Sequence, residues 1–324
     1  MKALIYKKYG QPQTVFKIEE QQKPIPKNTE VLVKVYNTTV NRTDEGIVTA
    51  RYVVSRLFSG LLRPKKQIPG TDFSGIITAI GDKVTIFKVG NKVFGFNDEG
   101  LSSHAEYLIL EEKKAIAIIP NNINFKQAVA SLEGMHYAIN FINKVKFKKQ
   151  TEILVYGATG AIGSAMVQLL KYYGCYVVAV ANTKNIDLIK SLDVDKVIDY
   201  QRENFTKETT KFDFVFDTVG KSSFSKSKGS LSKKGIYLSP VLGLSLLFQV
   251  IRTSIFGSKK AMFDATGLRP VPELRVLLQE LRTYIEAGSL RSIVDRRYRM
   301  DQVSEAHAYV DTGRKKGNVV LVTS

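Results

Sequence analysis

The spacing of apolar and polar positions changes character part of the way along this chain. The stretch 29–36 alternates with the period of two that is typical of a β-strand, and two apolar runs follow at 104–110 and 115–119. Together with the turns between them, these runs predict a compact, mostly antiparallel β domain over the first 120 or so residues.

Helical patterns follow, first over 125–132 and then over 135–143. From Thr151 onward, short apolar runs alternate with helical stretches, which is typical of a parallel sheet with crossover helices. An amphipathic helix is predicted over 272–287, and the tail predicts a strand, a helix and a last strand. The chain is therefore expected to be an α/β protein.

One turn in the second half of the chain has a nucleotide-binding pattern. The buried strand predicted at 153–156 meets a glycine-rich turn, and a helical stretch begins near Ala161. A strand, turn and helix in this order form the setting in which a G-x-G-x-x-G sequence binds a dinucleotide. The candidate cofactor-binding residues of the turn are Gly157, Ala158, Thr159, Gly160, Ala161, Ile162 and Gly163.

Each glycine of this turn has an expected task. Gly160 would let the backbone approach a pyrophosphate, and Gly163 would let the helix pack close to the strand. Free N–H groups at the start of the helix would hold the phosphates. Ala158 stands where the first glycine of the motif is expected, although Gly157 precedes it.

The residues after the next strand, 176–181, predict which dinucleotide is bound. An Asp or Glu about 20 residues after the glycines usually selects NAD by holding the ribose hydroxyls. Here Asn182 occupies that place, with Thr183 and Lys184 beside it, and such groups attract a 2′-phosphate that a carboxylate would repel. NADPH is thus the expected cofactor, and Tyr200 could cover its adenine or meet the same phosphate. Alternatively, Lys184 is an ordinary solvated charge.

Length and composition limit the remaining possibilities. At 324 residues the expected number of domains is two, and 44% hydrophobic residues supply two cores. The single cysteine, Cys175, excludes an internal disulfide and a multi-cysteine zinc site. The N-terminus has no apolar signal core, so a cytoplasmic location is expected by default.

The formal net charge of +18 is high for a metabolic enzyme. Lysines and arginines are scattered along the chain and are not interleaved with aromatic residues as in a nucleic-acid motif. This favours a solvated surface that draws in an anionic cofactor. Binding to anionic lipid or to nucleic acid is the less favoured alternative.

Six short motifs are spread over the whole chain: Val40-Asn-Arg-Thr-Asp44, Pro69-Gly-Thr-Asp-Phe-Ser-Gly75, Val89-Gly-Asn-Lys-Val-Phe-Gly95, the glycine turn 157–163, Asp217-Thr-Val-Gly220 and Lys316-Gly-Asn-Val-Val320. In this order they resemble the medium-chain dehydrogenase/reductase superfamily, in its zinc-free, quinone-oxidoreductase-like branch. The resemblance implies a GroES-like catalytic β domain over 1–122, completed by 290–324. It also implies a Rossmann domain with a doubly wound parallel sheet over 123–289, and an active site in the cleft between the two.

The resemblance also allows the zinc site of related enzymes to be sought in this chain. The cysteine ligand of zinc-using relatives falls near Asn41, and their Gly-His-Glu falls on residues 70–72, of which Thr71 replaces the histidine. Amide and hydroxyl groups are poor zinc ligands. The three histidines, His104, His136 and His307, match no ligand spacing. No metal is therefore expected, and the reaction would depend on the nicotinamide and on positioning.

Such chemistry suits electron-poor acceptors, namely quinones and α,β-unsaturated carbonyl compounds. By the resemblance, Asn41 and Tyr52 are candidates for polarising the acceptor oxygen, although Tyr52 could equally pack against its apolar neighbours. His136 stands where relatives place a residue near the cofactor. It would donate to the cofactor or supply a proton, or else simply pack in its helix.

Further cofactor contacts follow from the same resemblance. Val219 and Gly220 are expected near a ribose, and Leu242 and Asn318 near the nicotinamide end. The chain is accordingly expected to be an NADPH-dependent quinone or enone reductase. Two alternatives stay open: a non-catalytic NADPH-binding protein that uses its basic surface for membrane or RNA, and a zinc-independent alcohol or aldehyde dehydrogenase.

The segment 239–256 is unusually apolar. It is shorter than a membrane span and is interrupted by Gln249 and Arg252. It could lie in a membrane interface, but a helix at a dimer contact or over the cofactor is the preferred interpretation. By analogy with similar proteins, a homodimer is expected through an edge strand near 261–264.

Overall fold

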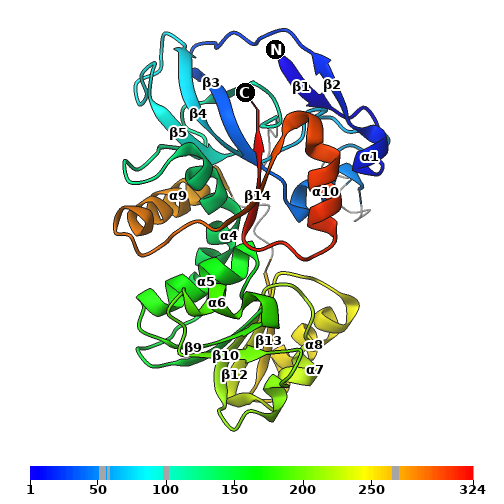
Figure 1. The fold of residues 1–324 in the computed structure, drawn as a ribbon, viewed down its shortest axis with the longest axis vertical. Helices are drawn as coiled ribbons and strands as arrows, with labels where there is room; N and C mark the ends of the chain where they lie inside the picture. Colours follow the sequence, from blue (N-terminus) through cyan, green and yellow to red (C-terminus); the bar gives the residue numbers. More distant parts are fainter. Residues whose placement is uncertain (51–55, 57–58, 98–101, 265–269, 324) are drawn as a thin grey trace. The chain divides into compact units, whose positions relative to one another are not determined.

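The computed structural model describes residues 1–50, 56, 59–97, 102–264 and 270–323. Its contacts divide the chain into two compact units, Met1–Glu133 together with Leu268–Ser324, and Gly134–Gly267. Each unit is built around a sheet of its own (Figure 1).

The first unit contains a seven-stranded sheet in the order β14-β15-β3-β4-β5-β7, with β6 paired to β3. Its strands are β3 (Glu30–Thr39), β4 (Asp72–Ile80), β5 (Lys92–Phe96), β6 (Tyr107–Glu111), β7 (Ile116–Ile118), β14 (Val294–Arg299) and β15 (Asn318–Val322). A separate antiparallel pair is formed by β1 (Lys2–Ile5) and β2 (Lys17–Glu20). Within the seven-stranded sheet only β14 and β15 pair in parallel, so the predicted antiparallel β domain is confirmed.

The alternation along β3 explains how this sheet forms its core. Val31, Val33 and Val35 are fully buried on one face and pack with Phe73 and Ile77 of β4. The described helices of this unit include α1 (Pro12–Val15), α2 (Arg42–Val48), α9 (Val271–Glu286) and α10 (Val303–Asp311), with a 3-10 turn η3 (Met300–Gln302). Helix α9 is the predicted amphipathic helix, and α10 and β15 match the predicted tail.

The two helices expected at 125–132 and 135–143 are one, and that prediction is wrong. Helix α4 runs without a break over Phe125–Asn143. Gly134 lies inside it, where a Cβ atom would come within 2.3 Å of the carbonyl oxygen of Ala161. The glycine therefore serves the close approach of two chain segments rather than the end of a helix.

The second unit is a six-stranded parallel sheet in the order β10-β9-β8-β11-β12-β13. Its strands are β8 (Glu152–Tyr156), β9 (Tyr176–Ala181), β10 (Lys196–Asp199), β11 (Phe212–Asp217), β12 (Leu231–Ser239) and β13 (Lys260–Phe263). Its helices are α5 (Ala161–Tyr172), α6 (Ile186–Lys190), α7 (Phe224–Ser227) and α8 (Leu244–Ile255), with 3-10 turns η1 (Thr183–Asn185) and η2 (Phe205–Lys207). Helices α5 and α6 lie on one side of the sheet, and α7 and α8 on the other (Figure 1).

The strands of this sheet are apolar on both faces because helices cover both. Leu154, Val178 and Val215 are almost completely buried. The strand order reverses between β8 and β11, and ligands of such sheets bind at the carboxyl ends of the strands beside this reversal. The predicted α/β class, with a mostly antiparallel β domain and a doubly wound parallel sheet, is confirmed. Cys175, directly before β9, is buried, and burial raises the pKa of its thiol to about 11.

Candidate cofactor and active site

The three glycines of the turn after β8 have different surroundings. Gly157 has a φ of 81°, and a Cβ there would lie 2.8 Å from the methyl groups of Val219. A Cβ at Gly163 would come within 2.2 Å of the Gly157 carbonyl oxygen. Gly160 instead has a φ of −72°, and the nearest atom to its Cβ would be 3.7 Å away. The fold requires glycine at 157 and 163, whereas Gly160 borders open space.

Helix α5 begins directly after this open position, with Gly160 as its N-cap. The N–H groups of Ala161, Ile162 and Gly163 belong to the first turn, where a helix has no internal acceptors for them. Ala158 is fully buried, and its N–H donates to the Val180 carbonyl at 3.3 Å, which fixes the turn against β9. With half-buried Thr159, the turn offers donors and a positive helix end that suit a pyrophosphate.

The residues expected to choose between NADPH and NADH follow the carboxyl end of β9. Lys184 is exposed, and Tyr200, beyond the end of β10, is 52% exposed. The Oδ1 atom of Asn182 is buried and has no hydrogen-bond partner among the described residues. This oxygen is an acceptor that a ribose hydroxyl would satisfy.

A carboxylate that sequence reasoning missed lies beside this group. Thr183 donates its hydroxyl to Asp199 Oδ2 at 2.5 Å, and the N–H of Gln201 donates to Asp199 Oδ1 at 3.0 Å. The Thr183 hydrogen bond is the main cause of a lowered Asp199 pKa, so the carboxylate stays ionised. The Thr183 hydroxyl is therefore engaged within the protein. Lys184 remains the exposed cation at this place.

A second carboxylate organises the loop after β11. Asp217 is fully buried and accepts the N–H groups of Val219, Gly220, Lys221 and Ser222 at 2.7–3.3 Å. It also accepts the hydroxyl of Tyr237 at 2.8 Å, and burial together with this carboxylate raises the Tyr237 pKa. The sequence offered only the motif Asp217-Thr-Val-Gly220 as a signal, without the role of its aspartate.

This loop, the glycine turn and the segment after β12 are neighbours. Thr218 donates its hydroxyl to the carbonyl of Tyr156 at 2.9 Å. Gly220 has a φ of 67°, and a Cβ there would lie 2.7 Å from Val241, the neighbour of exposed Leu242. The structure thus places four of the predicted groups side by side at the carboxyl ends of β8, β11 and β12. They are the glycine turn 157–163, Val219, Gly220 and Leu242.

His136 lies in α4, two residues beyond the point where Gly134 approaches Ala161. Its side chain is buried, and its ring is tilted against Tyr137 at 5.6 Å. Both of its predicted roles, a cofactor contact or helix packing, stay predictions.

In the first unit, Asn41 lies in a buried polar cluster at the start of α2. Its side-chain amide donates to Thr39 Oγ1 at 2.9 Å and to Asp72 Oδ2 at 3.2 Å. Thr39 in turn donates to Asp72 Oδ2 at 2.8 Å, and Asp44 accepts the Asn41 N–H at 2.9 Å. The amide protons are therefore used inside the protein, and the acceptor-polarising role of Asn41 stays a prediction. Tyr52 lies outside the described residues.

This cluster does not suit zinc. The three positions that correspond to zinc ligands in related enzymes are Asn41, Thr71 and Asp72. Of these only Asp72 is a carboxylate, and the Asn41 amide and the Thr71 hydroxyl are poor zinc ligands. His104 holds the Thr39 carbonyl at 2.9 Å, and burial lowers its pKa to about 4. Among the residues that the structure describes, no group of three or more His, Cys, Asp or Glu could hold a metal ion.

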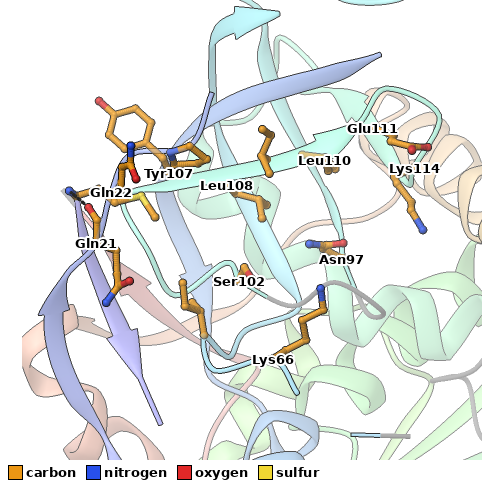
Figure 2. Close-up of a pocket in the computed structure, with 14 residues that line it drawn as sticks. Gln21, Gln22, Lys66, Asn97, Ser102, Tyr107, Leu108, Leu110, Glu111 and Lys114 are labelled. Atoms are coloured by element: carbon orange, nitrogen blue, oxygen red, sulfur yellow. Dashed lines mark hydrogen bonds between the residues drawn. The ribbon is translucent and has the colours of Figure 1, made fainter. Parts of the chain in front are cut away.

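Asn318 begins β15 in the first unit and is almost completely buried. Its backbone N–H donates to the Ile293 carbonyl at 2.8 Å, and its Oδ1 has no partner in the described part of the chain. A cavity of about 570 Å³ also lies in this unit, along β6. Figure 2 shows Lys66, Asn97 and Tyr107 among its lining side chains, which include none of the predicted site residues.

Comparison with known proteins identifies the family. The chain matches two sequence families, the alcohol dehydrogenase GroES-like domain over residues 27–121 and zinc-binding dehydrogenase over residues 192–321. A 2-methylene-furan-3-one reductase of Solanum lycopersicum is 30% identical over 333 residues, which cover 99% of this chain and 79% of the relative. A chloroplastic NADPH-dependent alkenal/one oxidoreductase of Arabidopsis thaliana is 29% identical over 340 residues, with the same coverage of each chain.

A solved structure, the quinone oxidoreductase from Coxiella burnetii, has the same fold. It superposes with a TM-score of 0.86 at 24% identity and covers 100% of this chain and 99% of its own. The predicted resemblance is thus confirmed. The chain belongs to the medium-chain dehydrogenase/reductase superfamily, in its quinone oxidoreductase and alkenal/one reductase branch, and is an oxidoreductase of that type.

Proposed function

We propose that this protein uses NADPH to reduce a quinone or an α,β-unsaturated carbonyl compound, without zinc. The observation that supports it best is the turn after β8. There the fold demands two glycines, while the third, Gly160, faces open space at the start of α5. The printed names of the relatives, an NADPH-dependent alkenal/one oxidoreductase among them, agree with this substrate class.

The preference for NADPH is supported by Lys184. Its exposed ammonium group follows β9, two residues after Asn182, which stands where enzymes that select NAD carry an acid. Asp199 lies nearby, but its oxygens are engaged by Thr183 and Gln201. An ammonium group attracts a 2′-phosphate, whereas Asp199 is a buried carboxylate that already accepts hydrogen bonds from Thr183 and Gln201.

The chain's own residues would bind and orient the cofactor, and the hydride chemistry would come from the cofactor itself. Backbone N–H groups of Ala161 to Gly163 would bind the pyrophosphate, and the loop fixed by Asp217 would border the ribose. When bound, the nicotinamide supplies the hydride. In an enone the hydride would go to the β-carbon, and water or a side chain would supply the proton for the α-carbon. The donor set around Asn41 and Asp72 supports a reaction without a zinc ion.

The proposal is tested by following NADPH oxidation with phenanthrenequinone and with small enones, alongside metal analysis of the purified protein. We expect turnover of at least one acceptor class by protein that carries no stoichiometric zinc. Saturable NADPH binding with no acceptor reduced would instead favour the non-catalytic alternative. Oxidation of alcohols by NADP⁺ with no reduction of enones or quinones would favour the dehydrogenase alternative.

The substitution Gly160→Ala separates the cofactor site from the fold. The added methyl group meets open space in the protein but would stand where the pyrophosphate approaches. We expect about a tenfold weaker NADPH affinity, worth about 1.4 kcal/mol, with a melting temperature within a few degrees of the native protein. Titration of NADPH by calorimetry measures the affinity. Gly163→Ala is the contrasting variant, because its methyl group would collide with the Gly157 carbonyl and lower the melting temperature.

The predicted homodimer and cytoplasmic location remain part of this proposal. Strand β13 is one of the two edge strands of the parallel sheet, so one side of its backbone is available for pairing with a second copy. Sedimentation of the purified protein would measure its oligomeric state.

A further inference from the structure

An acid lies one strand away from the position that selects the cofactor in a Rossmann sheet. Strands β9 and β10 are parallel neighbours, and their register pairs Asp199 with Ala181, the residue before Asn182. Asn182 stands where enzymes that select NAD carry the acid that holds the ribose hydroxyls. The carboxylate that is missing after β9 is therefore present at the end of β10.

The turn that follows β9 holds the Asp199 side chain inside the protein. Its Oδ2 accepts the Thr183 hydroxyl at 2.5 Å, and its Oδ1 accepts the Gln201 N–H at 3.0 Å. Only 3% of the Asp199 side chain is exposed, although Thr183 itself lies on the surface. The Arg202 Nε is 3.7 Å from Oδ2, and because the Arg202 side chain is 74% exposed this ion pair is weak. Of these contacts, the one with Thr183 is the shortest.

The carboxylate is expected to keep its charge without this hydroxyl. The Asp199 pKa is lowered first by the Thr183 hydroxyl, and further by the Gln201 N–H and the charge of Arg202. The last two remain when only the hydroxyl is lost. The turn also stays attached, because the Thr183 N–H donates to Gln201 Oε1 at 3.2 Å. Loss of the hydroxyl would thus release a negative charge without detaching the turn.

We propose that the Thr183 hydroxyl gives the protein its preference for NADPH by occupying Asp199. While the hydroxyl is bound to the acid, Lys184 is left to attract the 2′-phosphate. A released carboxylate would repel the 2′-phosphate of NADPH and would accept a ribose hydroxyl of NADH. Thr183 is then a positioning residue, which acts on the cofactor through Asp199. This inference rests on the cofactor site proposed above.

A direct contact between Thr183 and the 2′-phosphate is the competing explanation. The Thr183 hydroxyl has a single proton to donate, and Asp199 receives it. A phosphate at the same hydroxyl would compete with the carboxylate for that proton and would also meet its negative charge. The two explanations predict different results when Asp199 loses its charge.

The test is a double-mutant cycle on Thr183 and Asp199, with the dissociation constants of NADPH and NADH measured by calorimetry. Thr183→Val replaces the hydroxyl by a methyl group, and we expect it to lower the ratio of NADPH affinity to NADH affinity at least about tenfold. Part of this change should come from tighter binding of NADH. In the Asp199→Asn background, Thr183→Val should change the ratio by less than about threefold.

Two further variants control for the loss of a threonine hydroxyl. Thr183→Ser keeps the donor and should keep the native ratio within about threefold. Thr206→Val removes a hydroxyl of the same unit, which donates to Asn204 Oδ1 at 2.9 Å, and should also keep the native ratio. Melting temperatures of all variants should lie within a few degrees of the native protein.

The proposal is overturned if Thr183→Val keeps the native ratio, or if the native protein has no preference for NADPH. It is also overturned if Thr183→Val weakens NADPH binding equally with Asp199 and in the Asp199→Asn background, which would assign the hydroxyl to the phosphate itself. Failure of the proposed reaction has a different result, because native protein that binds NADPH but reduces no acceptor still completes the cycle. Native protein that binds neither cofactor overturns both proposals.

Discussion

Lys184→Glu is expected to lower kcat/KM for NADPH by about 30-fold and to change kcat/KM for NADH by less than about threefold. The substitution removes an exposed ammonium group at the end of β9 and replaces it with a carboxylate. A charge-assisted contact to a phosphate is worth about 2 kcal/mol, which corresponds to this ratio. Initial rates with both cofactors and one acceptor measure the effect.

Lys190→Glu is the matched control for this experiment. Lys190 is also exposed and lies at the end of α6, so the change in net charge is the same. Its effect on the two cofactors should be small and similar. An equal loss of NADPH and NADH in Lys184→Glu would show that Lys184 does not meet the 2′-phosphate.

Asp217→Asn should lower the free energy of unfolding by about 3 kcal/mol. The buried carboxylate accepts four backbone N–H groups and the Tyr237 hydroxyl. An amide in its place has no charge, and its NH₂ group would face backbone N–H donors. Each donor that is left without an acceptor costs about 1–3 kcal/mol. Urea unfolding monitored by circular dichroism measures the change. Because the Val219–Gly220 loop loses its support, NADPH affinity should fall as well.

Tyr237→Phe distinguishes the contribution of the Asp217 carboxylate from that of the Tyr237 hydroxyl. This variant removes one hydrogen bond and leaves Asp217 with its backbone donors, so we expect a cost of about 1 kcal/mol. If Asp217→Asn were no more harmful than Tyr237→Phe, the carboxylate would not be what holds the loop.

The parts of this protein that the sequence predicted well are those that depend on local patterns. The glycine turn requires only a strand, three glycines and a helix start, all within 153–163, and the structure places them as expected. The same holds for the last strand, 318–322. The domain order followed from the resemblance of motifs along the whole chain.

Contacts between distant residues were not predictable in this way. Asp199 is engaged by Thr183, which is 16 positions away, and only the pairing of β9 with β10 brings the two together. The hydrogen bond that the Asn41 amide donates to Asp72, 31 positions away, likewise has no signal in the local sequence. The helices expected at 125–132 and 135–143 are one helix, and the close approach of Gly134 inside it to Ala161 of another helix is a contact that no local pattern reveals.

The placement of Cys175 has a chemical consequence for an enzyme of this class. Quinones and enones are electrophiles that alkylate thiolates, and the thiolate rather than the thiol is the reactive form. The chain has a single cysteine, which is buried and has a pKa of about 11, so almost none of it is ionised at neutral pH. The protein can therefore handle thiol-reactive acceptors without inactivating itself through cysteine adducts.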